Sequence, residues 1–193
     1  MHRALAVGPP WAALDLAERA RALNERLDVT WTRPSVTTLN AELLFVSGEL
    51  EAAVRVLRPG SPPDRSNDGR TASLLFAELA LRLGDRSAPL AVADQLLAGD
   101  AFPVERARAH GLRGLVAALS GDRATAAAEL ARTSGVRGLG DGWLAVHRRW
   151  IHRLSGGDPD TDLPPVPPDE LALIHALDEA RGASPAWAQP RSP

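Results

Sequence analysis

The sequence predicts an all-α fold in which antiparallel helical hairpins stack on one another as a short α-solenoid. The first observation is a glycine that returns with similar residues behind it, at Gly8, Gly48, Gly84 and Gly121. Successive positions differ by 40, 36 and 37 residues, and a period in this range is typical of stacked helical repeats. The second observation is composition: 193 residues, 45% of them hydrophobic and 24% charged, suffice for one continuous core.

Each of these glycines is expected to be a hinge between two helices. Glycine takes a positive φ at no steric cost, and an acidic residue after it suits the positive start of the next helix. Four and five positions after the hinge, small residues are expected to let the second helix approach the first: Ala12, Ala13, Ala52, Ala53, Ala88 and Ala126. The matching small sites, seven positions before the hinge, are Ala41, Ala77 and Gly114.

Helical spacing of apolar residues, together with Pro and Gly positions, predicts the individual helices. A first helix is expected at about 11–27, and a last helix of the array at 141–154, ending at Gly156. Between them, the predicted hairpins pair residues 35–47 with 49–58, 70–83 with 87–98, and 104–120 with 122–132. Helix starts are assigned to Pro34, Asp68 and Pro103, with Ser87 as the cap of the helix that carries Pro89 in its first turn.

The chain is expected to have four parts. In order they are a repeat array at 1–156, a Pro- and Asp-rich linker at 157–168, a capping helix at 169–182 and a disordered tail at 183–193. The capping helix is predicted because a terminal repeat needs a cover for its apolar face. Its own apolar face consists of Leu171, Ile174 and Leu177. The residues before Gly8 resemble the end of a first-type helix, by which we mean the first helix of a hairpin. This leaves open that the chain is a fragment, or a shortened relative, of a longer array.

Composition favours a cytoplasmic protein. The chain has no Cys, no charged-then-apolar signal peptide and no stretch long enough to span a membrane. A net charge of −2 argues against a dedicated nucleic-acid surface. Apart from His, every basic residue is Arg, and Lys and Tyr are absent. We interpret this as a GC-rich coding bias, which indicates a high-GC bacterial source.

Candidate chemistry is sparse, and no catalytic motif or P-loop is present. Asp158, Asp160 and Asp162 alternate as in a calcium loop, but Leu163 stands where that loop needs Gly, so a solvated linker is the better interpretation. No metal or cofactor is expected. The helix at 141–154 carries a basic patch, which keeps a nucleic-acid surface as an alternative.

The alternative interpretation is that this basic helix is amphipathic, with one apolar face in the core and one face in solvent. The apolar stripe consists of Trp143, Val146, Trp150 and Leu154. Arg148 and Arg149 then form the solvated back of the helix. His147 and His152 are five residues apart, which is not the spacing of a zinc pair, and both are expected at the surface.

The hinges and small residues quoted above resemble the tetratricopeptide (TPR) repeat family over about residues 8–156. The resemblance implies a right-handed stack whose first-type helices line a concave groove. The family's large aromatic residues are mostly replaced here by Leu, Val and Ala, and Pro89 departs from the pattern. By distance from the hinge, the residues that would line the groove are Thr38, Glu42, Phe45, Leu74, Glu78, Arg82, Arg108, Leu115 and Leu119.

The resemblance implies a non-catalytic scaffold or adaptor that binds a protein or peptide. Glu42 and Glu78 occupy equivalent places, so the expected partner offers a basic residue near an apolar anchor. We expect no nucleic acid and no membrane as partner, and self-association stays open. The first alternative is a regulatory or sensor fragment, because Ala-rich degenerate repeats also resemble helical regions of large bacterial transcriptional regulators. A small-molecule enzyme on a helical scaffold is a more distant alternative.

Overall fold

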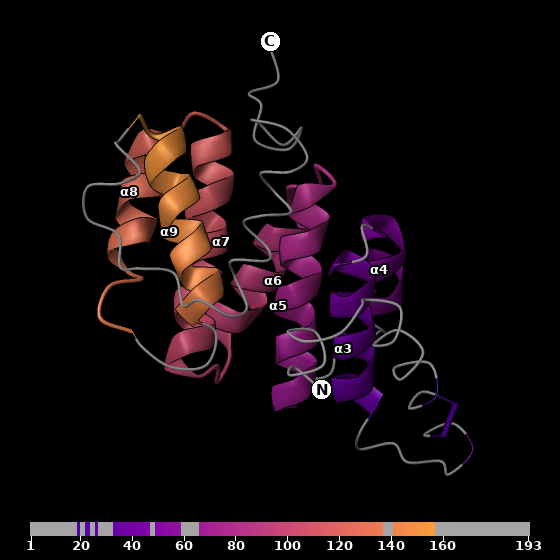
Figure 1. Ribbon diagram of the computed structural model, residues 1–193. Helices are drawn as coiled ribbons and strands as arrows, with labels where there is room; N and C mark the ends of the chain where they lie inside the picture. Colours follow the sequence, from indigo (N-terminus) through magenta and orange to yellow (C-terminus); the bar gives the residue numbers. More distant parts are fainter. Residues whose placement is uncertain are drawn as a thin grey trace. The chain divides into compact units, whose positions relative to one another are not determined.

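The computed structural model describes residues 19, 22, 23, 26, 33–46, 49–58, 66–136 and 141–156. Within these residues the chain forms seven α-helices of eight or more residues and no strand (Figure 1), which confirms the all-α prediction. The helices are α3 (Arg33–Val46), α4 (Leu50–Leu57), α5 (Asn67–Arg82), α6 (Ser87–Ala98), α7 (Pro103–Leu119), α8 (Arg123–Ala131) and α9 (Asp141–Leu154). Their bounds lie within three residues of the predicted ones.

The chain divides into two compact units, Met1–Leu79 and Ala80–Pro193, with the boundary inside α5. In the first unit α3 packs against α4. Ala41 on α3 and Ala53 on α4 are both fully buried, as the prediction of small contact sites requires. Larger apolar side chains, including Leu43 and Leu57, complete the core of this pair.

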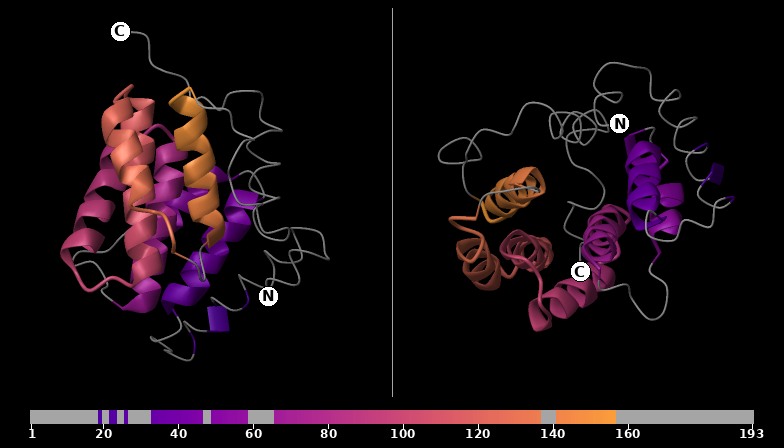
Figure 2. Two further views of the ribbon diagram at one scale, coloured as in Figure 1. Left: turned by 90° about the vertical axis from the view of Figure 1, so that its left-hand side faces the viewer. Right: turned by 90° about the horizontal axis from the view of Figure 1, so that it is seen from below.

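The second unit is organised around α7, which packs against α6, α8 and α9, while α8 also touches α9. Figure 2 shows α7, α8 and α9 running alongside one another. Pro103 begins α7 at a position where a missing N–H costs nothing. The Glu105 carboxylate accepts a hydrogen bond from the Phe102 backbone N–H at 2.7 Å. Leu112, Leu115 and other apolar residues on several sides of α7 are buried, as a central helix requires.

The turn at Gly84 is a Schellman motif, the common way in which a helix ends on glycine. Gly84 has a φ of 88°. Its N–H donates to the Leu81 carbonyl at 2.9 Å, and the N–H of Asp85 donates to the Ala80 carbonyl at 3.1 Å. These two bonds satisfy carbonyls that the end of a helix would otherwise leave without an intrahelical donor.

The turn at Gly121 repeats the same geometry 37 residues later. Gly121 has a φ of 79°. Its N–H donates to the Ala118 carbonyl at 3.1 Å, and the N–H of Asp122 donates to the Ala117 carbonyl at 3.0 Å. The predicted hinges at Gly84 and Gly121 are therefore confirmed, whereas Gly8 and Gly48 lie outside the described residues.

Burial follows the register that the hinges set. Seven positions before the hinge, Ala41, Ala77 and Gly114 are all buried. Five positions after it, the buried residues are Ala53, Pro89 and Ala126. Pro89 thus occupies the place of a small alanine, and Ala52 and Ala88 one position earlier are only half-buried. Ala12 and Ala13 lie outside the described residues.

Two of the predicted helix caps are wrong. Ser87 is the first residue of α6 rather than its cap, because the Asp85 carboxylate accepts from the backbone N–H of Ser87 at 2.8 Å and of Ala88 at 3.2 Å. The hydrogen bond from the Ser87 hydroxyl to this carboxylate lowers the pKa of Asp85 below its usual value. At α5, the Ser66 hydroxyl, and not Asp68, accepts from the backbone N–H of Gly69 at 3.0 Å.

The linker at 157–168, the helix predicted at 169–182 and the tail at 183–193 lie outside the described residues. The same holds for Asp158, Asp160 and Asp162, and for Leu171, Ile174 and Leu177. No described helix combines the length and the apolar character needed to cross a bilayer.

Candidate functional site

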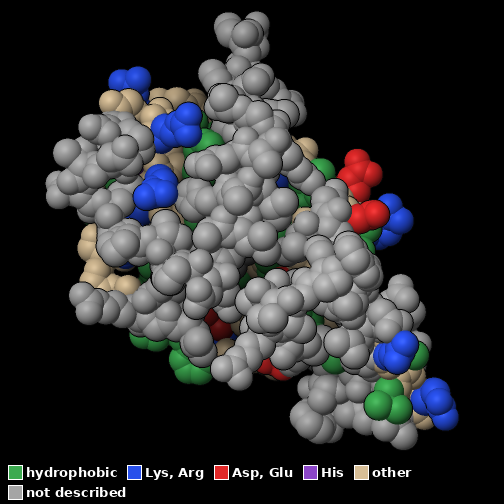
Figure 3. All heavy atoms as spheres, in the orientation of Figure 1, with side chains coloured by type: hydrophobic (Ala, Val, Ile, Leu, Met, Phe, Trp, Pro, Cys, Tyr) green, Lys and Arg blue, Asp and Glu red, His purple; other side chains and the backbone are tan. Residues whose placement is uncertain are grey.

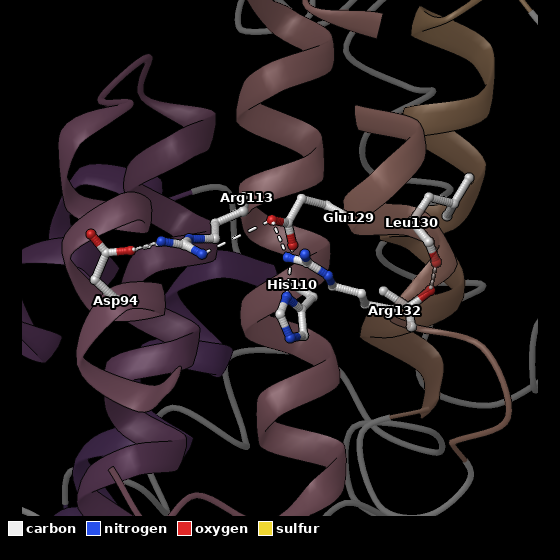
Figure 4. A network of polar contacts seen from close by, with 7 residues as sticks. Asp94, His110, Arg113, Glu129, Leu130 and Arg132 are labelled. Atoms are coloured by element: carbon white, nitrogen blue, oxygen red, sulfur yellow. Dashed lines mark hydrogen bonds and ion pairs between the residues drawn. The ribbon is translucent and has the colours of Figure 1, made fainter. Parts of the chain in front are cut away.

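A polar network centred on Glu129 joins α6, α7 and α8 (Figure 4). Nδ1 of His110 donates to Glu129 Oε2 at 2.6 Å, and the Arg132 guanidinium donates to Oε1 at 3.0 Å. A second guanidinium, that of Arg113, lies 3.9 Å from the same Oε1. Arg113 also donates twice to Asp94 on α6, at 3.0 and 2.6 Å. The network therefore alternates acidic and basic side chains from α6 across α7 to α8.

The carboxylate at the centre of the network is buried, while its partners lie nearer to solvent. The Glu129 side chain is 8% exposed, against 17% for His110, 35% for Arg113 and 56% for Arg132. An ionised carboxylate loses several kcal/mol of hydration on burial unless donors replace the water. His110 and the two arginines supply those donors, so the network stabilises a charge that the core would otherwise exclude.

Glu129 differs in chemistry from the residue at the same distance from the preceding hinge. It stands eight positions after Gly121, where the preceding hairpin has Val92 eight positions after Gly84. Both side chains are buried, the residues being 6% and 7% exposed. Neither Glu129 nor His110 is among the residues predicted from the sequence. The spacing from the hinge was the available signal, because the residue at the same distance from the preceding hinge is the apolar Val92.

A second polar contact joins the end of α8 to α9. Thr133 is fully buried, and its hydroxyl donates to the Leu130 carbonyl at 2.7 Å. The same hydroxyl accepts from Arg148 Nε at 3.0 Å, and the Thr133 carbonyl accepts from another guanidinium N–H of Arg148. Arg148 is therefore half-buried and bonded within the fold, which corrects its assignment to a solvated back of α9.

The other side chains of α9 divide more nearly as expected. Val146 and Trp150 of the predicted apolar stripe are buried, and Leu154 is half-buried. Arg153 is exposed, with its guanidinium carbon 5.3 Å from the centre of the Trp150 ring, within the range of a cation–π contact. Arginine side chains stand at the surface over the region of α8 and α9 in Figure 3. With Arg148 engaged by Thr133, the basic patch that favoured nucleic acid is smaller than the sequence indicated.

His147 is buried, which corrects its predicted surface position. The residue is 2% exposed and lies against Gly111 of α7, where an added Cβ would overlap the imidazole ring. Burial, and then the positive charges of Arg108 and Arg82, hold the pKa of His147 well below its usual value. His152 is half-buried. The two histidines thus lie in different surroundings, and the sequence could not distinguish them without knowing that Gly111 faces α9.

The residues predicted to line a groove fall into two groups. Thr38, Glu42 and Arg82 are half-buried, so part of each side chain is accessible. The remaining six are buried: Phe45, Leu74, Glu78, Arg108, Leu115 and Leu119. Glu78 is only 1% exposed, so its carboxylate does not offer the accessible charge that the sequence analysis assigned to it.

The arrangement around Glu129 positions charges but activates no nucleophile. Its hydrogen bonds join carboxylates, guanidinium groups and one imidazole, whose second nitrogen points away from Glu129 (Figure 4). Within the described part of the chain, no three His, Asp or Glu side chains gather as a metal site. The described hydrogen bonds and ion pairs link α6, α7 and α8 to one another.

Comparison with known protein families, with curated proteins and with solved structures finds no match to this chain.

Proposed function

We propose that the chain is a TPR-like α-solenoid that binds a protein or peptide as a scaffold or adaptor. The observation that carries this proposal is the repetition of the hinge. Gly84 and Gly121 are 37 residues apart, share a positive φ and make the same pair of backbone hydrogen bonds. A fixed period of this length is the signature of a stacked helical repeat, because each hairpin can bury its apolar side only against its neighbours.

The packing of α7 supports the same proposal. In a TPR-like stack, a first-type helix contacts the second helix of the preceding hairpin, its own second helix and the first helix of the next hairpin. These correspond to α6, α8 and α9, which are the helices packed against α7. Burial at Ala41, Ala77 and Gly114 agrees with one register for three first-type helices.

Engineered cysteines test the stacking, since the native chain has no Cys. Gly111 lies ten positions before Gly121, as Thr38 does before Gly48, and His147 lies nine positions before Gly156, as Leu75 does before Gly84. Since Gly111 lies against His147, the proposed stack places Thr38 of α3 beside Leu75 of α5. We expect the Thr38→Cys/Leu75→Cys protein to form an intramolecular disulfide under mild oxidation. The control pair Thr38→Cys/Ser73→Cys, with the second cysteine on the other side of α5, should stay reduced. Equal oxidation of both pairs would contradict the stacking.

Binding by the first-type helices is tested at Glu42, the accessible acidic residue of the proposed groove. Reversing its charge with Glu42→Arg should weaken the binding of a partner that offers a basic residue, because an attractive contact becomes repulsive. The matched control is Glu51→Arg on α4, a second-type helix whose Glu51 is exposed. Glu78 is left unchanged, because its burial would turn a reversal into a folding defect.

The measurement starts with capture of partners from cells of the source organism and their identification by mass spectrometry. The affinity of a purified partner is then measured by calorimetry. We expect Glu42→Arg to raise Kd at least about tenfold, which corresponds to about 1.4 kcal/mol, with helical circular dichroism unchanged. Glu51→Arg should leave Kd unchanged. Equal Kd values for both variants would move the binding surface away from the first-type helices.

A further inference from the structure

The contact between α7 and α9 is closer than an ordinary helix pair, because α7 presents two glycines to α9. At Gly111 an added Cβ would overlap the His147 ring, and at Gly114 it would lie 2.9 Å from Cδ1 of Ile151. Both facing side chains are almost fully buried, as is Leu144 one turn earlier. The imidazole of His147 therefore packs directly against the backbone of α7, and its burial removes it from the water that stabilises a charged ring.

The charged groups around this ring oppose a further positive charge. Arg108 of α7 and Arg82 at the end of α5 both act electrostatically on His147. On α9 itself, Arg148 is bonded to Thr133. On α8, the Glu129 carboxylate already accepts from His110 and Arg132 and lies near Arg113. Arg108 and Arg82 therefore disfavour a positive charge on the ring, while the buried carboxylate of α8 is engaged by His110 and Arg132.

We propose that the α7–α9 contact is an acid-sensitive joint, in which protonation of His147 favours a state where α9 has separated from α7. In the closed state, in which α9 packs against α7, the ring is buried and uncharged. In the opened joint it meets water and accepts a proton in the ordinary way. Acid therefore stabilises the opened state relative to the closed one, while the α7–α8 hairpin keeps its Schellman hinge, which contains no histidine.

The direction and size of the effect follow from linkage. The pKa of His147 is lowered in the closed joint and returns to about 6.5 in the opened one, so the opened state binds more protons below that pH. The contribution of His147 to closure is fully present above pH 6.5 and is lost as the pH falls. Between pH 7.5 and 5.5 the opening equilibrium constant should rise about tenfold.

Opening would uncover the apolar residues that α9 buries, among them Leu144 and Ile151. A protein built in this way would release α9 from α7 when it enters an acidic environment, as histidine-based switches do. This inference does not depend on the proposed binding function, because it concerns a contact inside the second unit.

Hydrogen exchange of the full chain at pH 7.5 and 5.5, corrected for intrinsic exchange rates, tests the joint. We expect amide protection in α9 to fall about tenfold at pH 5.5, with protection of the α7–α8 hinge unchanged. His147→Gln, which cannot take up a proton, should remove the pH dependence in α9. The matched control His152→Gln, at the half-buried histidine of the same helix, should keep it.

A second measurement needs no substitution. In the nuclear magnetic resonance spectrum, the carbon-bound imidazole protons of the five histidines report their titration individually. His147 should stay neutral at pH values somewhat below 6.5, where an ordinary imidazole is already charged. The proposal is overturned if α9 keeps the same protection at both pH values, if His147→Gln retains the tenfold change, or if His147 titrates near pH 6.5 while α9 stays protected.

Discussion

The hinges at Gly84 and Gly121 share one backbone geometry but lead into different cores. Each glycine and the aspartate after it donate to the same two carbonyl positions of the preceding helix. Eight positions on, however, the first hairpin has Val92 and the second has Glu129. The three partners of Glu129 have uncharged counterparts 37 residues earlier: Ser73 for His110, Phe76 for Arg113 and Gln95 for Arg132.

This difference separates two kinds of information in the sequence. The glycine, the aspartate and the small buried residues specify the helical hairpin, and they recur. The charged cluster around Glu129 occurs in one hairpin and comes as a set, because a buried carboxylate is tolerated only together with its donors. The hairpin therefore tolerates either an apolar or a fully paired charged side chain at this position.

The largest expected effect comes from placing the carboxylate in the other hairpin. Val92→Glu places a charge at a buried position for which the sequence register supplies no charged counterparts, and should lower the free energy of unfolding by about 3 kcal/mol or more. Burial raises the pKa of such a carboxyl group, so the loss relative to the native chain should shrink as the pH falls toward 5. Urea unfolding at pH 7 and 5 measures both. A loss below about 1 kcal/mol at pH 7 would show that the two cores are less different than the structure indicates.

The shared part of the hairpins is tested at the small contact sites. Ala126→Leu adds three carbons where the Ala126 carbonyl lies only 3.5 Å from a Cβ placed on Gly114. Overpacking of this kind should cost about 1 to 3 kcal/mol. Ala53→Leu at the equivalent site of α4 should behave alike. The control Ala127→Leu, at an exposed position of α8, should leave the urea midpoint nearly unchanged, and an equal shift in all three variants would argue against the register.

The hinge itself is tested by giving each glycine a side chain. Gly84→Ala and Gly121→Ala should each lose about 1 to 2 kcal/mol, because an L-residue at positive φ places Cβ against the following carbonyl. The control is Gly99→Ala, since Gly99 has a φ of −107° and meets only an ordinary contact. Thermal unfolding followed by circular dichroism compares the three. A much larger loss at one hinge would break the equivalence between them.

The smallest effect is expected from removing the charge at the second hairpin. Glu129→Val introduces the residue that the first hairpin carries, and should change the free energy of unfolding by less than about 1 kcal/mol, because the buried charge that it removes is the carboxylate itself and the Arg113 and Arg132 side chains left behind are 35% and 56% exposed. The freed arginines reach solvent. A loss of about 3 kcal/mol would mean that the network stabilises the hairpin rather than only being compatible with it.

Most of the helical architecture followed from local features of the sequence. Gly84, Gly121 and Gly156 end helices where the sequence placed those ends, and all three have a positive φ. These predictions were accurate because the end of a helix at a glycine with positive φ, and the apolar periodicity of the helix, each depend on only a few neighbouring residues. The misassigned cap at Ser87 has the same origin, since the sequence offers two acceptors two positions apart, Asp85 and Ser87, and only the backbone path selects Asp85.

The polar interior was harder to predict, because burial of a polar side chain depends on the helix that faces it. His147 was placed at the surface, since nothing within α9 shows that Gly111 makes room for its ring. Glu129 went unnoticed because its donors come from α7 and from beyond the end of α8. Glu78 was assigned to an open groove by its resemblance to TPR repeats, whereas this chain buries the residue.

The local character of the Gly121 hinge has a kinetic consequence. Its two Schellman hydrogen bonds join residues no more than five positions apart, and the turn returns α8 onto the helix that has just ended. Closing so short a loop costs little chain entropy, and chains dominated by such contacts fold within microseconds to milliseconds. Ribosomes add only about 5 to 20 residues per second. The α7–α8 hairpin therefore has time to form during synthesis, before the residues that build α9 have emerged.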